Sequence, residues 1–496
     1  MHAFSAYLCV MRGLFLLCFI GAYSLVLGQN IPSIQPKKNV EKLTLNRCIE
    51  LALSQNLDIQ LSSISTQNAD NEFSQSKFNL SPEISGNAGQ YYQSGRSIDR
   101  FTNQFVQTTI GSNNFQLQGN WVLFAGGQLR NAVNQAKYNK FATEQDLIQT
   151  KQTVALNVAL AYLQCLQAKE QEKASQNTVN SNLLEVDRIT KLLNSGMANE
   201  GMLWSAKAQY LNGVSLLTQA TNAYKACVNG LKNLLMIQPE VEIELMEVGN
   251  IGVEKKLYPI SLGELIDSAF AKRPEIKAAQ YRVEAAQFSV KAAKGSLYPT
   301  LSIGGNLNTV YSDNAKTITG MSLIGSQTIG VVKNSLELVE APLFAYNTQT
   351  IDFGKQVKDN FGQSFGATLS LPIYGKLQVH NQIKKAELGL LQNIISLKKN
   401  IQLVRNDVNT AYINYENSLS KFIALEETWN AQKKNLDFVK IRFSGGQATQ
   451  FELQSAENAN LSAYQNLISA KYELVFRKIF LDFIYRNTFI PQNIQE

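Results

Sequence analysis

The sequence NFQLQGNWVLFAGGQLRNAVNQAKY, residues 114–138, changes its periodicity halfway along. Between residues 115 and 123 apolar residues alternate with mostly polar ones, which is the pattern of a strand with one apolar face. After Ala125-Gly126-Gly127 this pattern stops, and about seventy residues follow with almost no Gly or Pro, which predicts a long helix. The chain therefore runs a short amphipathic strand directly into a very long helix.

The composition is that of an ordered protein without a nucleic-acid site. The 496 residues are 45% hydrophobic and 17% charged, with only 10 Pro. The net charge of +7 is spread without a basic block, which argues against nucleic acid and against a polybasic membrane patch. Beyond residue 28 the cysteines are Cys48, Cys165 and Cys227, an odd number that indicates no disulfide framework. Cys165 falls at a helical core position, where a small buried thiol is expected.

Residues 1–28 have the features of an export signal. Arg12 precedes an apolar run from Leu14 to Leu27, and we expect cleavage between Gly28 and Gln29. An uncleaved membrane anchor is the alternative, although the run is short for a span. Neither cysteine in this segment lies in a lipobox, so an acylated amino terminus is not expected. No later stretch reaches the ~20 apolar residues of a membrane helix, so a mature chain that enters a membrane needs a closed β-barrel.

The chain contains an internal repeat. LTLNRCIELALSQNLDIQ at 43–60 and ISLGELIDSAFAKRPEIK at 260–277 align without gaps at an offset of 217. Farther along, LFAGGQLRNAVNQAK aligns with LPIYGKLQVHNQIKKA at an offset of 248, and LNSGMANEGMLWSAKA aligns with FSGGQATQFELQSAEN at an offset of 250. About thirty residues are therefore inserted in the second copy. The matched landmarks are two prolines and four glycines: Pro82 with Pro299, Gly127 with Gly375, and Gly196 with Gly446.

Each copy reads as helix, strand pair, long helix, Gly-marked turn and long helix. After a linker at 29–42, the predicted first repeat covers 43–240, with a helix at 43–80, a β-hairpin at 81–124 and a long helical hairpin at 125–238. A second linker at 241–259 leads to the second repeat at 260–487. Its parts are a helix at 260–297, a β-hairpin at 298–372 and a long helical hairpin at 375–487, followed by a tail at 488–496.

The strand pairs predict a membrane β-barrel. The predicted strands cover residues 83–92, 114–123, 302–312 and 361–372, each with one apolar face and one small polar face. A soluble two-layer sheet is the alternative, and it requires another element to cover the apolar face. Four strands are too few to close a membrane barrel, which takes about eight. We therefore expect three chains to share one twelve-stranded barrel.

The long helix at 128–194 carries two neighbouring heptad rows. The first row contains Val158, Cys165, Val179, Val186 and Leu193, with Glu172 as its one polar member, and the second contains Leu147, Val154, Ala161 and Ala168. Two seams predict a coiled-coil helix with neighbours on both sides, as in a ring. At about 1.5 Å per residue, such a helix reaches on the order of 100 Å, enough to cross most of a periplasm.

The order of these motifs and their duplication resemble those of the TolC outer-membrane efflux family. The residues that carry the resemblance are the openings LTLNRCIELAL and ISLGELIDSAF, Pro82 and Pro299, WVLFAGGQLR with LSLPIYGKLQ, the Ala-Tyr pairs at 161–162 and 411–412, and the two Gly turns. The resemblance runs from residue 43 to about 487. It implies a mixed α/β membrane protein located in the bacterial outer membrane and extending into the periplasm.

The family resemblance also implies the assembly and its partners. It implies a homotrimer with a shared twelve-stranded β-barrel in the outer-membrane lipid and a tunnel of twelve coiled-coil helices. A tapered tip docks a periplasmic adaptor and an inner-membrane pump of the RND or ABC type. Such a channel is a passive conduit of a tripartite efflux or type I secretion system, and it needs no cofactor.

The resemblance further assigns roles near the Gly turns at 194–199 and 444–449. Relatives with acidic rings at the periplasmic entrance carry carboxylates six and nine residues after the position of Gly446. Those positions hold Glu452 and Ser455 here, against Met202 and Ser205 in the first copy. We expect three copies of Glu452 to form a cation-attracting constriction, with an ordinary exposed carboxylate as the alternative. The expected adaptor-docking tips contain small or polar residues: Ser195, Gly196, Ser444, Gly445, Gly446 and Gln447.

Some relatives lock this entrance with a Tyr and an Arg at the places of Phe443 and Ala448. Neither side chain can make that polar link, which puts a lock of that type in doubt here. Arg442, Arg188 and Lys191 lie near the two tips and could substitute for it.

Nothing in the sequence indicates an enzyme. His380 is the only histidine beyond residue 28, which argues against a His-dependent triad or a multi-histidine metal site. No GxxxxGK[ST] or GxGxxG loop occurs. We expect no catalytic, cofactor-binding or metal-binding residues. The remaining alternatives are a periplasmic coiled-coil adaptor and a trimeric adhesin or structural protein, and neither explains the doubled alternation of strands and helices.

The two strand pairs have connections of unequal length. About fifty residues, 312–361, separate the strands of the second pair, against about twenty in the first. Both connections lie opposite the helices in this arrangement. We therefore expect the larger loop outside the cell, where it caps or narrows the outer mouth.

Overall fold

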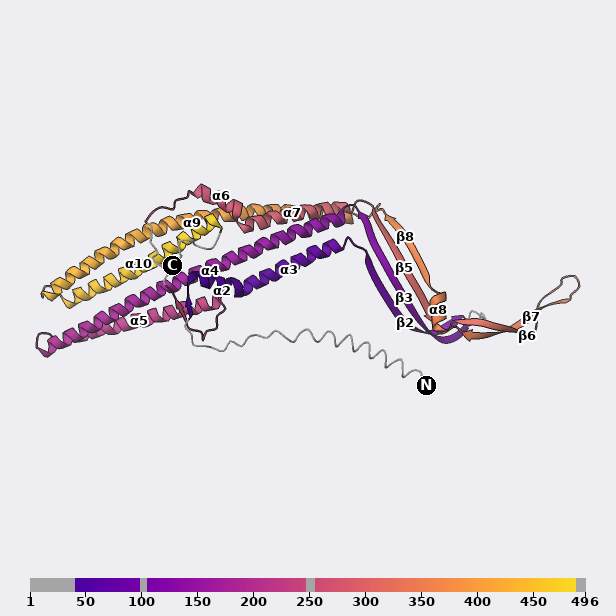
Figure 1. The fold of residues 1–496 in the computed structure, drawn as a ribbon, viewed down its shortest axis with the longest axis horizontal. Helices are drawn as coiled ribbons and strands as arrows, with labels where there is room; N and C mark the ends of the chain where they lie inside the picture. Colours follow the sequence, from indigo (N-terminus) through magenta and orange to yellow (C-terminus); the bar gives the residue numbers. More distant parts are fainter. Residues whose placement is uncertain (1–40, 99–104, 247–254, 488–496) are drawn as a thin grey trace.

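The molecule is elongated, with long helices at one end and a narrow sheet at the other (Figure 1). The computed structural model describes residues 41–98, 105–246 and 255–487. The expected export signal and tail, most of the first linker and part of the second lie outside the described residues.

Both halves of the chain use the same order of elements, except that the second half has three more, β6, β7 and α8, between its two sheet strands. The first half contains β1 (Glu41–Leu43), α2 (Leu45–Gln55), α3 (Leu57–Phe78), β2 (Glu83–Ile98), β3 (Phe105–Ala125), α4 (Gln128–Asn194) and α5 (Glu200–Leu234). The second half contains β4 (Ile243–Leu245), α6 (Leu262–Lys272), α7 (Pro274–Gly295), β5 (Thr300–Ser312), β6 (Lys316–Val331), β7 (Leu338–Thr350), α8 (Phe353–Asp359), β8 (Gly362–Ser370), α9 (Gln378–Ser444) and α10 (Gln450–Arg486). The parallel pair β1 and β4 joins the two halves.

The helices expected at 43–80 and 260–297 are each broken in two, so the expectation of single helices was wrong. Asn56 has an extended backbone, and its side-chain oxygen accepts hydrogen bonds from the amides of Asp58 (2.9 Å) and Ile59 (3.4 Å), which starts α3. Arg273 is also extended, because the ring of Pro274 disfavours a helical residue before it. The repeat offset of 217 relates the two breaks.

Four strands form one antiparallel sheet in the order β2-β3-β5-β8. They match the four predicted strands, although β3 begins at residue 105 instead of 114. Because paired residues share a face, the register separates two surfaces. The first is apolar and includes Phe115, Leu117, Trp121, Ile303, Leu307 and Leu369. The second consists of carboxamides and small residues, among them Asn87, Gln116, Gln118, Asn120, Asn306 and Asn308.

The connection at 312–361, expected to be a loop, is ordered as two further strands and a short helix. β6 and β7 form a two-stranded ribbon, residues 316–350, that projects beyond the sheet (Figure 1). Its register shifts between Ile318 and Gly320, and again between Leu323 and Gly325 and between Thr328 and Gly330. Each bulge inserts one residue, which moves the alternation out of phase about every five residues. Because the inserted residues all lie in β6, its alternation is broken and the sequence pattern does not identify this strand.

The joint between sheet and long helix has the same backbone in both copies but different residues. Gly126 and Gly127 are left-handed, with φ of 59° and 78°, and a Cβ on Gly126 would lie 2.2 Å from the carbonyl oxygen of Gly295. In the second copy the left-handed residues are Lys376 and Leu377. The counterpart of Gly127 is therefore Leu377, and the alignment with Gly375 was wrong by two residues.

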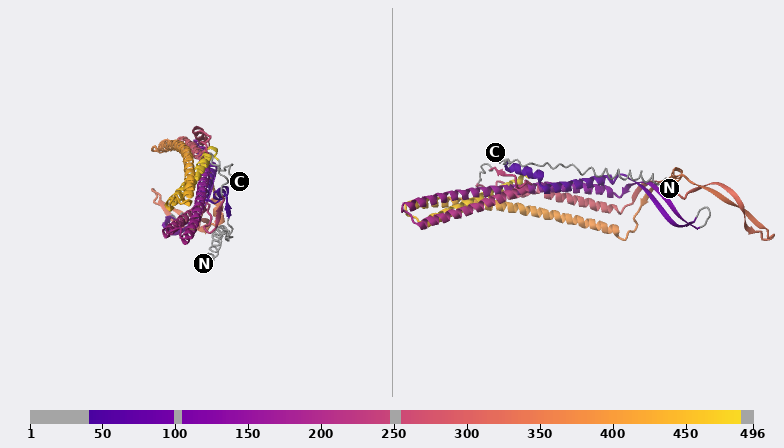
Figure 2. Two further views of the ribbon diagram at one scale, coloured as in Figure 1. Left: turned by 90° about the vertical axis from the view of Figure 1, so that its left-hand side faces the viewer. Right: turned by 90° about the horizontal axis from the view of Figure 1, so that it is seen from below.

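The helices form one curved layer (Figure 2). Next to the sheet its order is α3, α4, α7, α9, and toward the far end it is α5, α4, α10, α9. Val154, Val158, Cys165, Ala168 and Val179 of the predicted heptad rows are buried in this layer. None of the described helices combines the length and the hydropathy required to cross a membrane.

Two buried tyrosines attach the connecting segments to the outside of this layer. Tyr162 on α4 donates from its hydroxyl to the carbonyl oxygens of Leu43 (3.0 Å) and Met246 (2.6 Å). Tyr415 on α9 donates to the carbonyl oxygen of Lys256 at 2.9 Å. Burial raises the pKa of Tyr162 well above its ordinary value, so this hydroxyl keeps its proton. The middle of the layer is thus fixed by contacts with β1 and with the second linker.

Candidate functional site

Both helical hairpins reverse through the same backbone turn. The amide of Met197 donates to the carbonyl oxygen of Leu192 (2.9 Å), and the amide of Gln447 donates to that of Arg442 (2.8 Å). Gly196 and Gly446 are both left-handed with φ of 73°, as this helix-ending motif requires. Gly445 has φ of −86° and does not need to be glycine. Of the expected tip glycines, two are therefore required by the backbone.

The polar tip residues differ in how many of their hydrogen-bonding groups are already used within the tip. The hydroxyls of Ser195 and Ser444 each donate to a carbonyl of the preceding turn, at 2.9 and 2.8 Å. Gln447 is exposed, and its backbone carbonyl oxygen accepts from the guanidinium of Arg442 at 2.8 Å. A Cβ on Gly196 or Gly446 would meet nothing within 4 Å. The tips are therefore small, internally hydrogen-bonded and exposed to solvent on the single chain.

Glu452 holds the start of α10. Its carboxylate accepts from the backbone amide (2.7 Å) and the hydroxyl (3.0 Å) of Thr449, while its own amide donates back to that hydroxyl (3.2 Å). These bonds form a capping box. The amide of Thr449, then its hydroxyl, then Arg442 at 3.8 Å lower the pKa of Glu452. Ser455 is also exposed, one helical turn away, whereas Met202 and Ser205 in the first copy are half-buried.

The two hairpins meet near their tips through a contact that the sequence did not reveal. The guanidinium of Arg188 on α4 lies over the ring of Phe443 on α9, 5.0 Å from its centroid. Glu185 orients Arg188 through hydrogen bonds of 2.8 and 2.7 Å. Phe443 and Ala448 otherwise pack on a small core that includes Leu453. Phe443 therefore contacts Arg188, one of the three residues expected to substitute for a Tyr–Arg lock, through the face of its ring. Lys191 pairs with Asp187 at 2.6 Å and takes no part.

A carboxamide network joins the hairpins farther from the tips. Gln209 on α5 donates to Asn458 at 3.0 Å and accepts from Gln454, both on α10. The backbone carbonyl oxygen of Gln209 accepts from the side-chain amide of Asn182 on α4 at 3.2 Å. Single glutamines and asparagines on separate helices give no sequence pattern, so this network was not predicted.

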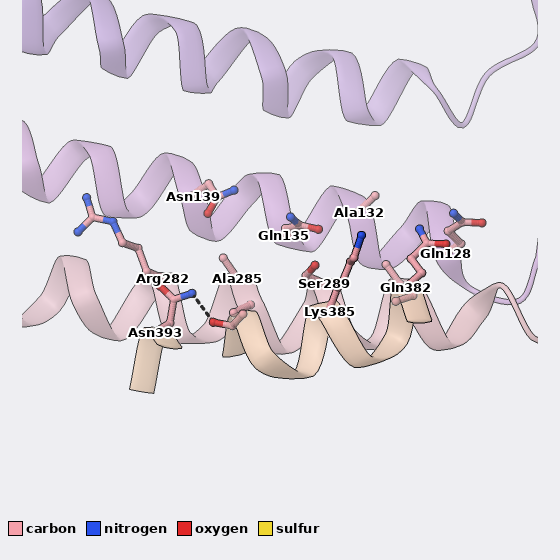
Figure 3. A pocket seen from close by; sticks show the side chains of 15 residues that line it. Gln128, Ala132, Gln135, Asn139, Arg282, Ala285, Ser289, Gln382, Lys385 and Asn393 are labelled. Atoms are coloured by element: carbon pink, nitrogen blue, oxygen red, sulfur yellow. Dashed lines mark hydrogen bonds between the residues drawn. The ribbon is translucent and has the colours of Figure 1, made fainter. Parts of the chain in front are cut away.

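A hollow of about 730 Å³ lies near the sheet, between α4, α7 and α9 (Figure 3). Its lining combines small α7 residues with carboxamides, including Ala285, Ser289, Gln128, Gln135, Asn139 and Gln382. Arg282 and Lys385 are the cations on this lining, and Arg282 is paired with Asp146. No group of three or more His, Cys, Asp or Glu residues in the described ranges could hold a metal ion. The hollow is therefore lined mainly by uncharged polar and small side chains, and its lining suggests no catalytic group.

The family model described as "Outer membrane efflux protein" matches residues 48–235 and 265–482, which are the two halves just described. The chain belongs to this family. Family members are channels, not enzymes, which agrees with the absence of catalytic motifs.

Individual relatives agree with this assignment. The chain is 23% identical over 437 residues to "Toxin and drug export protein A" of Aggregatibacter actinomycetemcomitans, covering 87% of this chain and 83% of that protein. It is 23% identical over 332 residues to "Outer membrane protein TolC" of Escherichia coli (strain K12), covering 66% and 60%. The solved structure of the outer-membrane channel OprN has a TM-score of 0.69 at 19% identity, covering 89% of both chains, and so shares the fold.

Proposed function

We propose that the chain is a homotrimeric outer-membrane channel with a periplasmic tunnel, serving as the passive conduit of a tripartite efflux or type I secretion system. The observation that carries this proposal is that the sheet and the helical layer each have two edges against which no described element packs. The sheet ends in β2 on one side and β8 on the other, while the helical layer ends in α3 or α5 and in α9. Three such units supply twelve strands and twelve helical positions, enough to close both walls.

The helical edges expose apolar rows at the spacing of a helix–helix seam. On α3 the exposed residues are Leu57, Leu61 and Ile64, and on α9 they are Leu388, Leu391 and Ile395. Spacings of three and four residues place each row on one face. Rows of this kind on opposite edges are suited to packing α3 of one copy against α9 of the next.

The sheet supports an outer-membrane location. Its apolar face suits lipid, and Trp121 near one end and Tyr92 near the other suit the two membrane interfaces. The opposite face is polar but uncharged across the four-stranded region, apart from Glu83 at its end. In a closed barrel that face lines the lumen, so the barrel passes hydrated solutes without selecting by charge.

The hairpin tips are the proposed docking surface for a periplasmic adaptor, which connects the channel to an inner-membrane RND or ABC pump. Support comes from the small, solvent-open turns at Gly196 and Gly446, where another helical hairpin can approach end-on. In this proposal the partner pump supplies the energy for export.

Reconstitution tests the channel directly. The purified protein, added to one side of a planar lipid bilayer, should give discrete conductance steps that reach the same unit size in repeated insertions. Protein that is folded by circular dichroism but gives no steps at any applied voltage would contradict the proposed conduit. Export-deficient growth of a deletion strain, restored by the intact gene, would connect the conductance with export in the host.

Glu452 and Ser455 are the residues proposed to form the constriction. The substitution Glu452→Gln removes the charge of this side chain but keeps its ability to cap the helix. Glutamine at this position also completes a capping box, so α10 should start normally. We expect cation preference in bilayers to fall in Glu452→Gln, whereas Ser455→Ala should keep it. Unchanged selectivity in Glu452→Gln would leave Glu452 with its capping role alone.

The pH dependence follows from the same hydrogen bonds. Because the folded state lowers the pKa of Glu452 below its ordinary 4.5, the carboxylate is charged throughout the neutral range. The capping contribution is complete above the ordinary pKa and is lost as pH falls through the lowered one. Cation preference measured by reversal potential should therefore persist through the neutral range and decline at acidic pH. A preference that stays unchanged when the solution is acidified would contradict this assignment.

A further inference from the structure

The β6–β7 ribbon has an apolar face that nothing in the described chain covers. The register pairs Met321 with Tyr346 and Leu323 with Phe344, so these four side chains share a face with Ile318. All five are exposed, with 67% of Met321 and 65% of Leu323 accessible. An isolated two-stranded ribbon is marginally stable in water, and an apolar face of this size favours a partner.

The opposite face of the same segment is small and polar. It carries Gly320, Ser322, Ala345 and Asn347. No charged residue occurs from 317 to 332 on the first strand or from 341 to 351 on the second. Identical copies of the ribbon can therefore approach through their apolar faces without repulsion between like charges.

The base of the ribbon is held firmly to the sheet. The side chain of Gln356 on α8 is buried; it accepts from the amide of Ser312 (3.0 Å) and donates to the carbonyl oxygens of Ser312 (2.9 Å) and Ile351 (2.8 Å). The ring of Phe353 packs edge-on against that of Phe115, with the centroids 6.3 Å apart, and at a tilt against that of Tyr311, with the centroids 5.1 Å apart. The direction of the ribbon is thus set by the barrel strands.

The length of the ribbon exceeds the diameter of the proposed barrel. Its first strand has 16 residues and spans about 50 Å at about 3.3 Å per residue. Twelve strands spaced by about 4.8 Å and tilted by about 40° enclose a barrel about 24 Å across. Three ribbons on one rim are therefore always within reach of each other, at an effective concentration of order mM.

We propose that the β6–β7 ribbons of the three copies associate through this apolar face and form a cap over the outer mouth. The apolar face of each ribbon is covered by the apolar face of the ribbon from another copy. The proposal rests on the trimer of the proposed function and adds an interface outside the barrel. Cargo then leaves between the ribbons or by parting them.

Two adjacent cysteine substitutions on opposite faces test the cap. Leu323→Cys lies on the apolar face and Ser322→Cys on the small polar face, and both native side chains are exposed on the single chain. Purified protein is oxidised mildly and run on a denaturing gel without reductant, with the unsubstituted chain as background for Cys48, Cys165 and Cys227. Intact cells are treated in parallel with a membrane-impermeant maleimide, and the mass of each variant is measured in detergent.

The cap predicts disulfide-linked dimers for Leu323→Cys, limited to two of the three chains in each trimer, and none above background for Ser322→Cys. It also predicts slow labelling of Leu323→Cys and fast labelling of Ser322→Cys. Equal, fast labelling in variants that remain trimers would overturn the cap and leave the channel intact. Slow labelling of Leu323→Cys without dimers would mean that lipid or another protein covers the face, which also overturns the proposal. A monomeric mass would remove both the cap and the trimer.

Discussion

Gly446→Trp should abolish export while leaving a trimer correctly inserted in the outer membrane. No atom lies within 4 Å of the position where a Cβ would be placed, so the folded chain accommodates the side chain sterically. The left-handed backbone adds strain of about 1 kcal/mol for a residue other than glycine, which is small for a local turn. The indole, however, occupies the surface proposed to contact the adaptor. Growth of the native host on compounds that a deletion strain does not tolerate is the readout.

Two matched variants separate the effect of the bulky side chain on docking from the effect of backbone strain at Gly446. Gly446→Ala has the same left-handed backbone without the indole, and it should export nearly as well as the unsubstituted protein. Gly445→Trp adds the same ring at a residue whose φ of −86° requires no glycine. It should impair export without backbone strain. Undiminished export in Gly446→Trp, with the trimer present in outer-membrane fractions, would remove the docking assignment from this tip.

Leu307→Arg should nearly eliminate the protein from the outer membrane. Leu307 lies near the middle of β5, on the apolar face beside Leu117, where the proposed barrel meets lipid. An arginine at mid-membrane on a lipid-facing position costs about 2–4 kcal/mol per chain, and a trimer carries three of them. The quantity measured is the amount of heat-modifiable protein in outer-membrane fractions.

The neighbouring residue provides the control. Asn308 follows Leu307 on β5, is exposed, and lies on the carboxamide face opposite Gln116. Asn308→Arg should insert at normal levels and shift the pore toward anions, because its charge lies in the hydrated lumen. Normal insertion of Leu307→Arg, or loss of Asn308→Arg instead, would show that the assignment of the two faces is reversed.

The sequence was sufficient for the parts of the fold that repeat or alternate without interruption. The strand at 114–123, the prolines that follow each first helix and the glycines at the two turns each impose one local geometry. These features occur twice in the same order, which made the doubled architecture readable. The four barrel-type strands and the four long helices follow from them.

The remaining features depend on interruptions and on contacts between distant residues. Three bulges shift the phase of β6, so period-two alternation does not identify it. The break at Asn56 had a usable signal, since asparagine is a good helix cap, and Pro274 marked the equivalent break in the second copy. The contact of Arg188 with Phe443 joins residues 255 positions apart, and no local pattern encodes it. At the tips, sequence alone located the turns but missed the capping role of Glu452.

The central claim is that three copies close one barrel and one tunnel, and the mass of the detergent-solubilised protein tests it most directly. Light scattering corrected for bound detergent, combined with native mass spectrometry, should give three times the mass of the processed chain. Far-ultraviolet circular dichroism on the same sample should show the predominantly helical content of the described structure. A monodisperse monomer with that same spectrum would contradict the account, because its apolar edges on α3 and α9 and its unpaired strands β2 and β8 would then have no partner.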